Sequence, residues 1–261
     1  MIHELRLFLI ALQFMTRVPV PRWVGFEPGW LNRSARHFAG VGMLVGVFGA
    51  AVLWCASRCW PMAVAVGLSM AATLWLTGAF HEDGFADTCD GLGGAVTRER
   101  ALEIMKDSRI GAFGAIGIVT MLGLKAATLV TLPLATALPA LVLGHTASRA
   151  AATAVMLMLP YAGDAAHAKA KPLAQQVGTG EVIGAALWVA LACAGVWAVG
   201  GITVSTLGVA LAGTAGASVL CVRWLRCRLG GFTGDTLGAT QQITELALLL
   251  GVSAAWPAGL A

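Results

Sequence analysis

Residues 182–222 read VIGAALWVALACAGVWAVGGITVSTLGVALAGTAGASVLCV and contain no Asp, Glu, Lys or Arg. An α-helix needs about 20 apolar residues to cross a bilayer, so this run is long enough for two crossings. Gly200 and Gly201 interrupt it near the middle, where a tight turn favours residues with a permissive backbone. The stretch therefore predicts two membrane-spanning helices, at 182–200 and 202–222.

The whole chain has the same apolar character. Hydrophobic residues make up 58% of it and charged residues 11%, with a mean hydropathy of +0.80, whereas a soluble domain carries about 25% charged residues. The predicted spans are 37–57, 61–80, 111–131, 138–159, 182–200, 202–222 and 243–260. We expect an all-α, polytopic transmembrane helix bundle of about seven spans, forming a single domain over residues 1–261.

Positive charge is distributed unevenly among the connecting segments. With the N-terminus in the cytoplasm, the inner segments are 1–36, 81–110, 160–181 and 223–242. They hold fourteen of the seventeen Lys and Arg residues, and the outer loops hold only Arg58. This asymmetry follows the positive-inside rule. It explains the net charge of +4 without a nucleic-acid partner, and it places both polar clusters, 81–110 and 223–245, on the cytoplasmic face.

The first twenty residues, MIHELRLFLIALQFMTRVPV, alternate polar and apolar positions at helical spacing. Glu4, Arg6 and Arg17 interrupt any signal-peptide core, so the segment predicts an amphipathic helix at the inner interface that ends at Pro19–Pro21. The six cysteines show no CxxC and no His/Cys ligand spacing. They are expected to be ordinary apolar residues of the bundle.

An acidic cluster, HEDGFADTCDGLGG, occupies residues 81–94 directly after an uncharged run. Asp83, Asp87 and Asp90 are spaced i, i+4 and i+7, which places them on one helical face. Like charges on one face repel each other, so a cation is expected between them. Oxygen-only clusters select hard ions, and Mg²⁺ held by carboxylates together with substrate phosphates is the common arrangement. Glu82 and the three aspartates are therefore predicted metal ligands, and Asp90 is also a candidate catalytic residue.

A mixed polar segment follows this cluster. Residues 97–105 predict a short helix with Thr97 as its N-cap, on which Glu99 and Arg100 are expected to be solvated. Lys106, Ser108 and Arg109 then precede the next span, as candidates for binding diphosphate oxygens that the metal leaves free, with Arg109 the catalytic candidate. His81 is either a general base, a substrate ligand, or an interfacial histidine bonded to a carboxylate.

The segment 230–245, GGFTGDTLGATQQITE, resumes the polar pattern. Asp235, Gly238, Gln242 and Glu245 share one helical face, and a polar stripe entering an apolar span normally faces the bundle interior. Asp235 and Glu245 are predicted to complete the metal site, with Thr233 and Gln242 binding substrate. The neighbouring Arg223, Arg226 and Arg228 are explained by topology and anionic headgroups.

Charged residues also occur within the predicted spans. His145 and Arg149 are spaced i, i+4 inside the span 138–159, where an arginine costs about 2.5–3.5 kcal/mol to insert. Arg149 is predicted either to bind a phosphate from the bundle interior or to pair with a buried carboxylate. Lys125 lies nearer the outer side and is expected to snorkel to the interface.

Three motifs, HEDGFADTCDGLGG, LEIMKDSRIGAFG (102–114) and GGFTGDTLGATQQITE, together with the opening LRLFLIALQFMTRVPVP (5–21), closely resemble the cobalamin synthase family. This family is also called adenosylcobinamide-GDP ribazoletransferase, and the resemblance covers nearly the full chain. It implies a Mg²⁺-dependent enzyme of the bacterial inner (cytoplasmic) membrane, with adenosylcobinamide-GDP and α-ribazole, or α-ribazole 5′-phosphate, as substrates. The products would be adenosylcobalamin, or its 5′-phosphate, and GMP. A homo-oligomer or association with other corrinoid-pathway enzymes is compatible with the apolar surface.

Two other classes share some of these features. CDP-alcohol phosphotransferases also use an acidic motif but carry Ala-Arg where this chain has Ala86-Asp87, and membrane prenyltransferases space their acidic residues differently. A cation transporter could place carboxylates in its pathway. However, the acidic cluster lies at the cytoplasmic end of a span and the sequence shows no duplicated halves.

Overall fold

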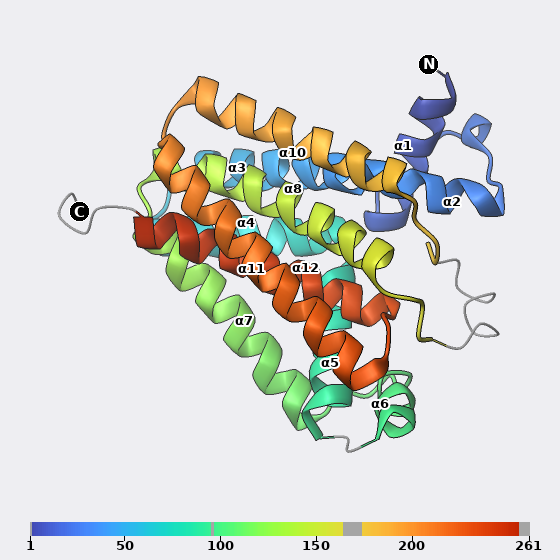
Figure 1. The fold of residues 1–261 in the computed structure, drawn as a ribbon. Coiled ribbons are helices and arrows are strands. Elements are labelled where there is room, and N and C mark those ends of the chain that lie inside the picture. Colours follow the sequence, from blue (N-terminus) through green and yellow to red (C-terminus); the bar gives the residue numbers. More distant parts are fainter. Residues whose placement is uncertain (1, 95–96, 164–173, 256–261) are drawn as a thin grey trace.

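The computed structural model describes residues 2–94, 97–163 and 174–255, and it is a bundle of α-helices (Figure 1). The helices are α1 (Ile2–Met15), α2 (Pro28–Ser34), α3 (Phe38–Ala56), α4 (Met62–Thr77), α5 (Phe80–Gly94), α6 (Arg98–Ile104), α7 (Ala112–Thr131), α8 (Leu134–Met158), α10 (Thr179–Val199), α11 (Val204–Leu229) and α12 (Gly234–Ala255), with the 3-10 turns η1 (Arg22–Val24) and η2 (Ala35–His37). One isolated β-bridge joins Tyr161 and Phe232. The all-α prediction is confirmed.

Five helical segments in the described part of the chain have the length and hydropathy to cross a membrane. They are Gly29–Ala56, Ala112–Thr131, Leu134–Met158, Thr179–Val199 and Val204–Leu229. They correspond to five of the predicted spans and make the chain a multi-pass membrane protein. Among the described residues the count rises to six if α4 and α5 form one bent span.

The two remaining predicted spans differ from the prediction for different reasons. α4 has only 16 residues, about 24 Å at 1.5 Å per residue, which is shorter than the roughly 30 Å hydrocarbon layer. α12 begins well before the predicted residue 243, and its first three turns carry Asp235, two glutamines and Glu245. The predicted span 243–260 also extends past Ala255, beyond the described residues.

A sharp bend separates α4 from α5, so the acidic cluster forms a new helix and does not continue the preceding one. The axes of the two helices differ by 89°. Gly78 and Ala79 take positive φ angles of 69° and 56°, which is uncommon for alanine. The end of α1 supports the bend, because the backbone N–H of Arg17 donates to the carbonyl of Leu76 at 2.8 Å.

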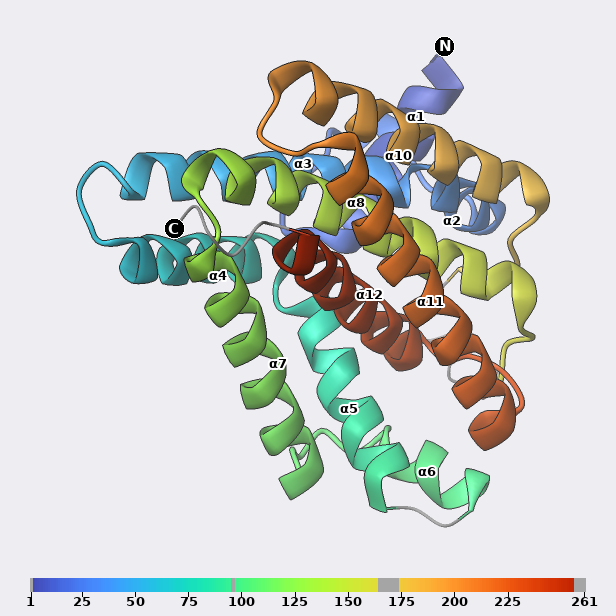
Figure 2. The same cartoon turned by 60° about the vertical axis from the view of Figure 1, so that its left-hand side comes forward.

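α12 lies in the middle of the bundle, packed between α5 and α7 on one side and α8 and α11 on the other (Figures 1 and 2). It is polar along its first half, yet Gln241, Gln242 and Glu245 are all buried. Because backbone and side-chain polar groups need partners inside an apolar bundle, a helix of this kind is stable only where its neighbours supply them.

The helix ends form two groups. The connections α3–α4, α7–α8 and α10–α11 lie at one end of the bundle, and α1, α2, α6 and the start of α12 lie at the other (Figures 1 and 2). The second end carries most of the Lys and Arg residues, among them Arg17, Arg36, Lys106 and Arg226. The charge asymmetry expected from the sequence is therefore a property of the folded bundle.

The most extensive helix contact, between α3 and α8, depends on small residues. A Cβ added to Gly42 would collide with the carbonyl oxygen of His145, and one added to Gly46 would lie 2.7 Å from the Cα of Val142. Gly42 and Gly46 form the small-xxx-small pattern that lets membrane helices approach closely.

We expect Gly42→Ala to lower the thermal unfolding temperature in detergent, because backbone atoms of α8 cannot yield as a side chain can; overpacking of this kind costs about 1–3 kcal/mol. The matched control is Gly123→Ala on α7, where an added Cβ meets nothing within 4 Å. An unchanged unfolding temperature in both variants would contradict this account of the α3–α8 contact.

Candidate functional site

The acidic cluster forms a regular helix, as the i, i+4, i+7 spacing predicts. Asp83, Asp87 and Asp90 all lie within α5. Asp83 is exposed, and Asp87 and Asp90 are half-buried. Asp83 and Asp87 are one turn apart, which gives this face of α5 two hard oxygen donors near the polar end of the bundle.

Asp90 has a structural task that the sequence did not reveal. Its carboxylate accepts hydrogen bonds from the backbone N–H groups of Gly111, at 2.7 Å, and Gly114, at 2.8 Å. It therefore caps the N-terminus of α7 from another helix, where a negative charge is stabilising. The two glycines permit this approach, because a Cβ at either would press on the Asp90 carboxylate.

α5 and α12 meet through two glycines. A Cβ at Gly84 would lie 2.9 Å from the Cα of Asp235, and a Cβ at Gly238 would lie 2.9 Å from the carbonyl oxygen of His81. The start of α12 is held by reciprocal hydrogen bonds between Thr233 and Thr236, with the Thr233 hydroxyl accepting from the Thr236 N–H at 3.3 Å. The backbone of Asp235 is thus brought against α5, and Thr233 acts as the cap of α12.

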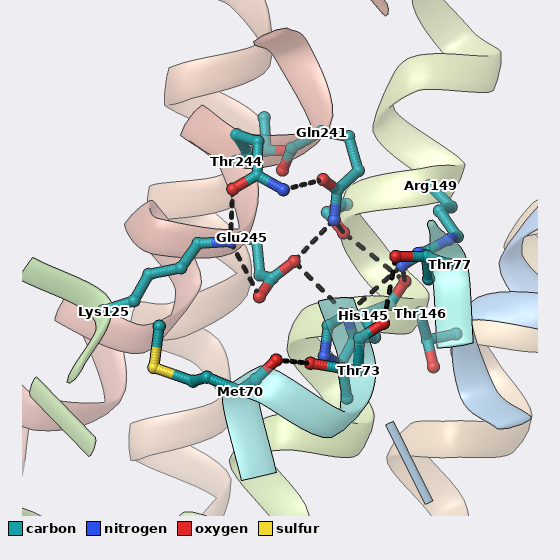
Figure 3. Close-up of polar contacts among 12 residues, drawn as sticks. Met70, Thr73, Thr77, Lys125, His145, Thr146, Arg149, Gln241, Thr244 and Glu245 are labelled. Atoms are coloured by element: carbon teal, nitrogen blue, oxygen red, sulfur yellow. Dashed lines mark hydrogen bonds and ion pairs between the residues drawn. The ribbon is translucent and has the colours of Figure 1, made fainter. Parts of the chain in front are cut away.

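A network of buried charged and amide side chains fills the interior between α7, α8 and α12 (Figure 3). Lys125 approaches one oxygen of Glu245 at 3.0 Å, and the Nδ1 atom of His145 approaches the other at 3.3 Å. The Gln241 amide also donates to Glu245 and to the Ser148 hydroxyl. Lys125 and Glu245 are each 4% exposed, so both ions depend on these contacts.

Gln242 connects this network to α5. Its amide oxygen accepts from Lys125 at 2.7 Å, and its amide nitrogen donates to Glu82 at 2.8 Å. Lys125 is only a donor and a carboxylate oxygen is an acceptor, so the orientation of this amide is determined by its partners. Gln242 is 1% exposed, and its contacts are those of an internal bridge.

Two residues of the network differ from their sequence interpretation. Lys125 was expected to snorkel towards the outer interface, but it turns inward to Glu245. Glu245 was expected to join the α5 carboxylates at a metal; instead the structure surrounds it with Lys125, His145 and Gln241. A carboxylate or a lysine that is buried without a partner inside the membrane is costly. The occurrence of one of each within apolar segments was therefore the sequence signal that Lys125 and Glu245 pair.

The carboxylates do not form an all-protein metal cage. Within the described ranges, no three His, Cys, Asp or Glu side chains are grouped closely enough to hold a metal ion. Mg²⁺ is usually held by one or two carboxylates with water and substrate phosphates completing its shell. Asp83 and Asp87, at adjacent turns with one of them exposed, fit that open arrangement.

A small cavity lies on another side of α5, between α1, α3, α8 and the start of α12. His81 and Arg149 supply its polar side chains, and Phe14, Phe38 and Phe80 form apolar wall. Arg149 is 2% exposed; its Nη1 donates to the His145 carbonyl at 3.0 Å, while its buried Nε has no partner among the described residues. The structure thus brings together His81 and Arg149, which the sequence had placed in separate motifs.

The segment between α6 and α7 is more exposed than the rest of the site. Arg109 has 88% of its side chain exposed and binds Asp107 through hydrogen bonds as short as 2.7 Å. These hydrogen bonds lower the pKa of Asp107 to about 2, so the pair stays ionised at neutral pH and separates only as the pH falls towards that value. Lys106 and Ser108 are also exposed, and all three predicted contacts lie beside the N-terminus of α7.

Together these features define a polytopic helical membrane protein whose carboxylates, cations and helix N-termini converge at the polar end of α5, α7 and α12. The chain belongs to the cobalamin-5-phosphate synthase family, whose model matches residues 7–253. This match includes α5, the α6–α7 segment and nearly all of α12, and it decides against the other classes of phosphotransferase and the transporter considered from the sequence.

Proteins named adenosylcobinamide-GDP ribazoletransferase are similar to the chain over almost its whole length. That of Leptothrix cholodnii is 59% identical, covering 100% of this chain and 98% of its own. That of Ralstonia nicotianae is 47% identical over 95% of this chain and 94% of its own, and that of Shewanella amazonensis is 44% identical over 97% of both. No solved structure matches the chain.

We expect the Lys125–Glu245 pair to stabilise the bundle as a unit. Lys125→Met or Glu245→Gln alone leaves one buried charge uncompensated, at a cost of about 3 kcal/mol or more. The double variant removes both charges, so it should be destabilised by less than the sum of the single variants. Unfolding in detergent, analysed as a double-mutant cycle, measures this coupling, and strictly additive effects would show that the two ions do not depend on each other.

Proposed function

We propose that the protein is a Mg²⁺-dependent transferase that moves the cobinamide-phosphate moiety of adenosylcobinamide-GDP to α-ribazole or α-ribazole 5′-phosphate. The products are adenosylcobalamin, or its 5′-phosphate, and GMP. The observation that carries the proposal is the family match over residues 7–253. The relatives' names support the choice of substrates.

In the proposed reaction a ribose hydroxyl of the acceptor attacks the cobinamide-side phosphorus of the diphosphate. A new P–O bond forms, the bond to the bridging oxygen breaks, and GMP leaves with the electron pair. Such a transfer needs positioning and neutralisation of charge more than a covalent nucleophile. A membrane protein with few charged residues can provide this only where they are concentrated, which favours the α5 face.

Asp83 and Asp87 would hold the Mg²⁺ ion, which supplies charge neutralisation on the diphosphate oxygens. In this proposal Asp90 and Glu82 support the site through contacts within the protein. Asp90 accepts hydrogen bonds at the N-terminus of α7, and Glu82 accepts one from Gln242. Lys106 and Arg109 lie in the same exposed segment, where their cations can reach the departing GMP phosphate. Ser108, between them, adds a hydroxyl donor.

Asp235 is the carboxylate best placed to accept the proton of the attacking hydroxyl. Its backbone contacts α5 at Gly84, which lies on the helix between the Asp83–Asp87 face and the His81 side. An acceptor bound at the edge of the α5–α12 contact would therefore meet Asp235 next to the carboxylates that are proposed to bind the metal. His81 and Arg149 would then help to bind the substrates.

We place this site at the cytoplasmic face of a bacterial inner membrane. The end of the bundle that contains α6 and the start of α12 carries most of the Lys and Arg residues, and the positive-inside rule assigns such an end to the cytoplasm. Nucleotide substrates are cytoplasmic molecules, so a site at this end needs no transport step.

The first experiment measures GMP release by the purified full-length protein supplied with adenosylcobinamide-GDP and α-ribazole 5′-phosphate. We expect release to require both substrates and Mg²⁺, and to be lost with a chelator. Asp83→Asn should reduce kcat by about 100-fold or more, because an amide cannot replace a carboxylate at a metal.

The matched control is Glu103→Gln, which removes an exposed carboxylate that pairs with Arg100 on α6 and should leave GMP release unchanged. Folded wild-type protein that releases no GMP would overturn the proposed activity. Full release by Asp83→Asn would instead overturn the assignment of the metal site.

A further inference from the structure

Asp90 holds one end of the segment that carries Lys106 and Arg109. One of its carboxylate oxygens accepts a hydrogen bond from the backbone N–H of Gly111, and the other accepts one from that of Gly114. Both oxygens are therefore engaged with the start of α7, where the helix dipole also favours a negative charge. Because Gly111 is the residue directly before α7, these bonds fix the point at which the chain enters that helix.

The other end of the segment is held by the next residue of α5. A Cβ added to Gly91 would lie 2.7 Å from the Cγ of Met105 and 2.9 Å from the carbonyl oxygen of Ala101, so the end of α6 packs closely on α5. Met105 itself is buried. Residues 106–110, here called the strap, connect Met105 to Gly111. Two consecutive residues of α5 therefore anchor both ends of the strap.

The strap is attached at the end of the face of α5 that carries the carboxylates. Asp83, Asp87 and Asp90 lie within about 60° of one another around the helix axis, and Asp90 lies about 4.5 Å along the axis from Asp87. The anchor is thus about one turn beyond the carboxylates that are proposed to bind Mg²⁺. Lys106 and Arg109 are exposed on the strap, and cations in this position can bind oxygens of a diphosphate held on that face.

We infer that Asp90 is a positioning residue, which holds the strap so that Lys106 and Arg109 reach the phosphate of the departing GMP. The inference rests on the proposed function. It gives Asp90 an action through two cations, in place of the direct metal-binding or catalytic role that its spacing predicts. Such an action needs a carboxylate, because a group with one acceptor oxygen cannot serve both N–H groups in the same way.

The first measurement is amide hydrogen exchange of the full-length protein in detergent, without substrates. Asp90→Ala removes two hydrogen bonds from the start of α7, so exchange within residues 105–114 should become faster by about 10-fold or more. Exchange in α10 and α11 should stay as it is in the wild-type protein. This result reports on the anchor alone and does not depend on activity.

GMP release then tests whether the anchor serves the reaction. Asp90→Ala should lower kcat by about 10- to 100-fold, because displaced cations stabilise the leaving phosphate less well in the transition state. The Mg²⁺ concentration that gives half the maximal rate should change by less than about twofold, because Asp83 and Asp87 remain. Asp90→Asn keeps one acceptor oxygen, so its kcat should lie between those of the wild-type protein and Asp90→Ala.

A double-mutant cycle shows whether Asp90 acts through the strap. The reference is a variant with Lys106→Gln and Arg109→Gln, which has already lost the two cations and is expected to have a lower kcat. Adding Asp90→Ala to this reference should lower kcat further by less than about threefold. A metal ligand or a proton acceptor would instead lose its full factor in the reference as well.

Gly111→Ala is a second variant in case Asp90→Ala does not fold. Its Cβ would lie 2.5 Å from an oxygen of Asp90, so it displaces the carboxylate without removing its charge. It should reproduce both the lower kcat and the unchanged Mg²⁺ requirement. The matched control is Thr203→Ala, which removes a side-chain cap from α11 at the opposite end of the bundle and should leave kcat unchanged.

The outcomes separate the anchor from the proposed function. Unchanged exchange within residues 105–114 in both Asp90→Ala and Gly111→Ala would overturn the inference, as would a Mg²⁺ requirement raised by about tenfold or more. An additive loss in the cycle would also overturn it and would give Asp90 a direct part in the reaction. Absence of GMP release from folded wild-type protein would overturn the proposed function, whereas faster exchange in the two variants would still support the anchor.

Discussion

The structure depends on the buried ion pair between Lys125 and Glu245. Each ion alone would be too costly in an apolar bundle, so neither α7 nor α12 can adopt its position without the other. His145 adds α8 to the same carboxylate, and Gln242 adds α5 through Glu82. Four helices that are distant in sequence are therefore fixed by one connected set of polar contacts.

This network gives the polar residues on α12 a structural role. A polar stripe on a membrane helix looks like a substrate path, but Gln241, Gln242 and Glu245 are all bonded to other side chains of the protein. They make α12 rigid and centrally placed, and a rigid helix is what a site built at its N-terminus requires. Asp235 and the start of α12 are consequently held against α5 by interactions deep in the bundle.

Much of the architecture follows from local sequence patterns. The charge-free run at 182–222 predicts α10 and α11 because hydrophobic length is a strong local signal, and the spacing of Asp83, Asp87 and Asp90 predicts their common helical face. Hydropathy does not register a bend such as that at Gly78–Ala79, so the change of direction between α4 and α5 was not predicted. It also does not register a helix such as α12, whose polar half is buried.

The partners of individual side chains could not be predicted in the same way. Lys125 and Glu245 are separated by 120 residues in the chain, and only the packing of α7 against α12 places them together. The capping of α7 by Asp90 similarly depends on two glycines in a different motif, Gly111 and Gly114. The sequence shows which residues are unfavourable to bury without a partner, whereas the fold determines which of them pair with each other.

The bend between α4 and α5 explains how a strongly acidic helix can exist in this protein. If α5 continued along the axis of α4, its carboxylates would come directly after a helix of only 16 residues. They would then lie within the bilayer interface. The 89° turn directs α5 away from that axis, so that Gly84 meets α12 while Asp83 stays exposed. One side of α5 is thereby buried against the bundle and the other faces the polar end. The Asp83 carboxylate therefore stays in contact with water while the opposite side of α5 packs in the bundle, so the fold avoids the cost of burying that charge without a partner.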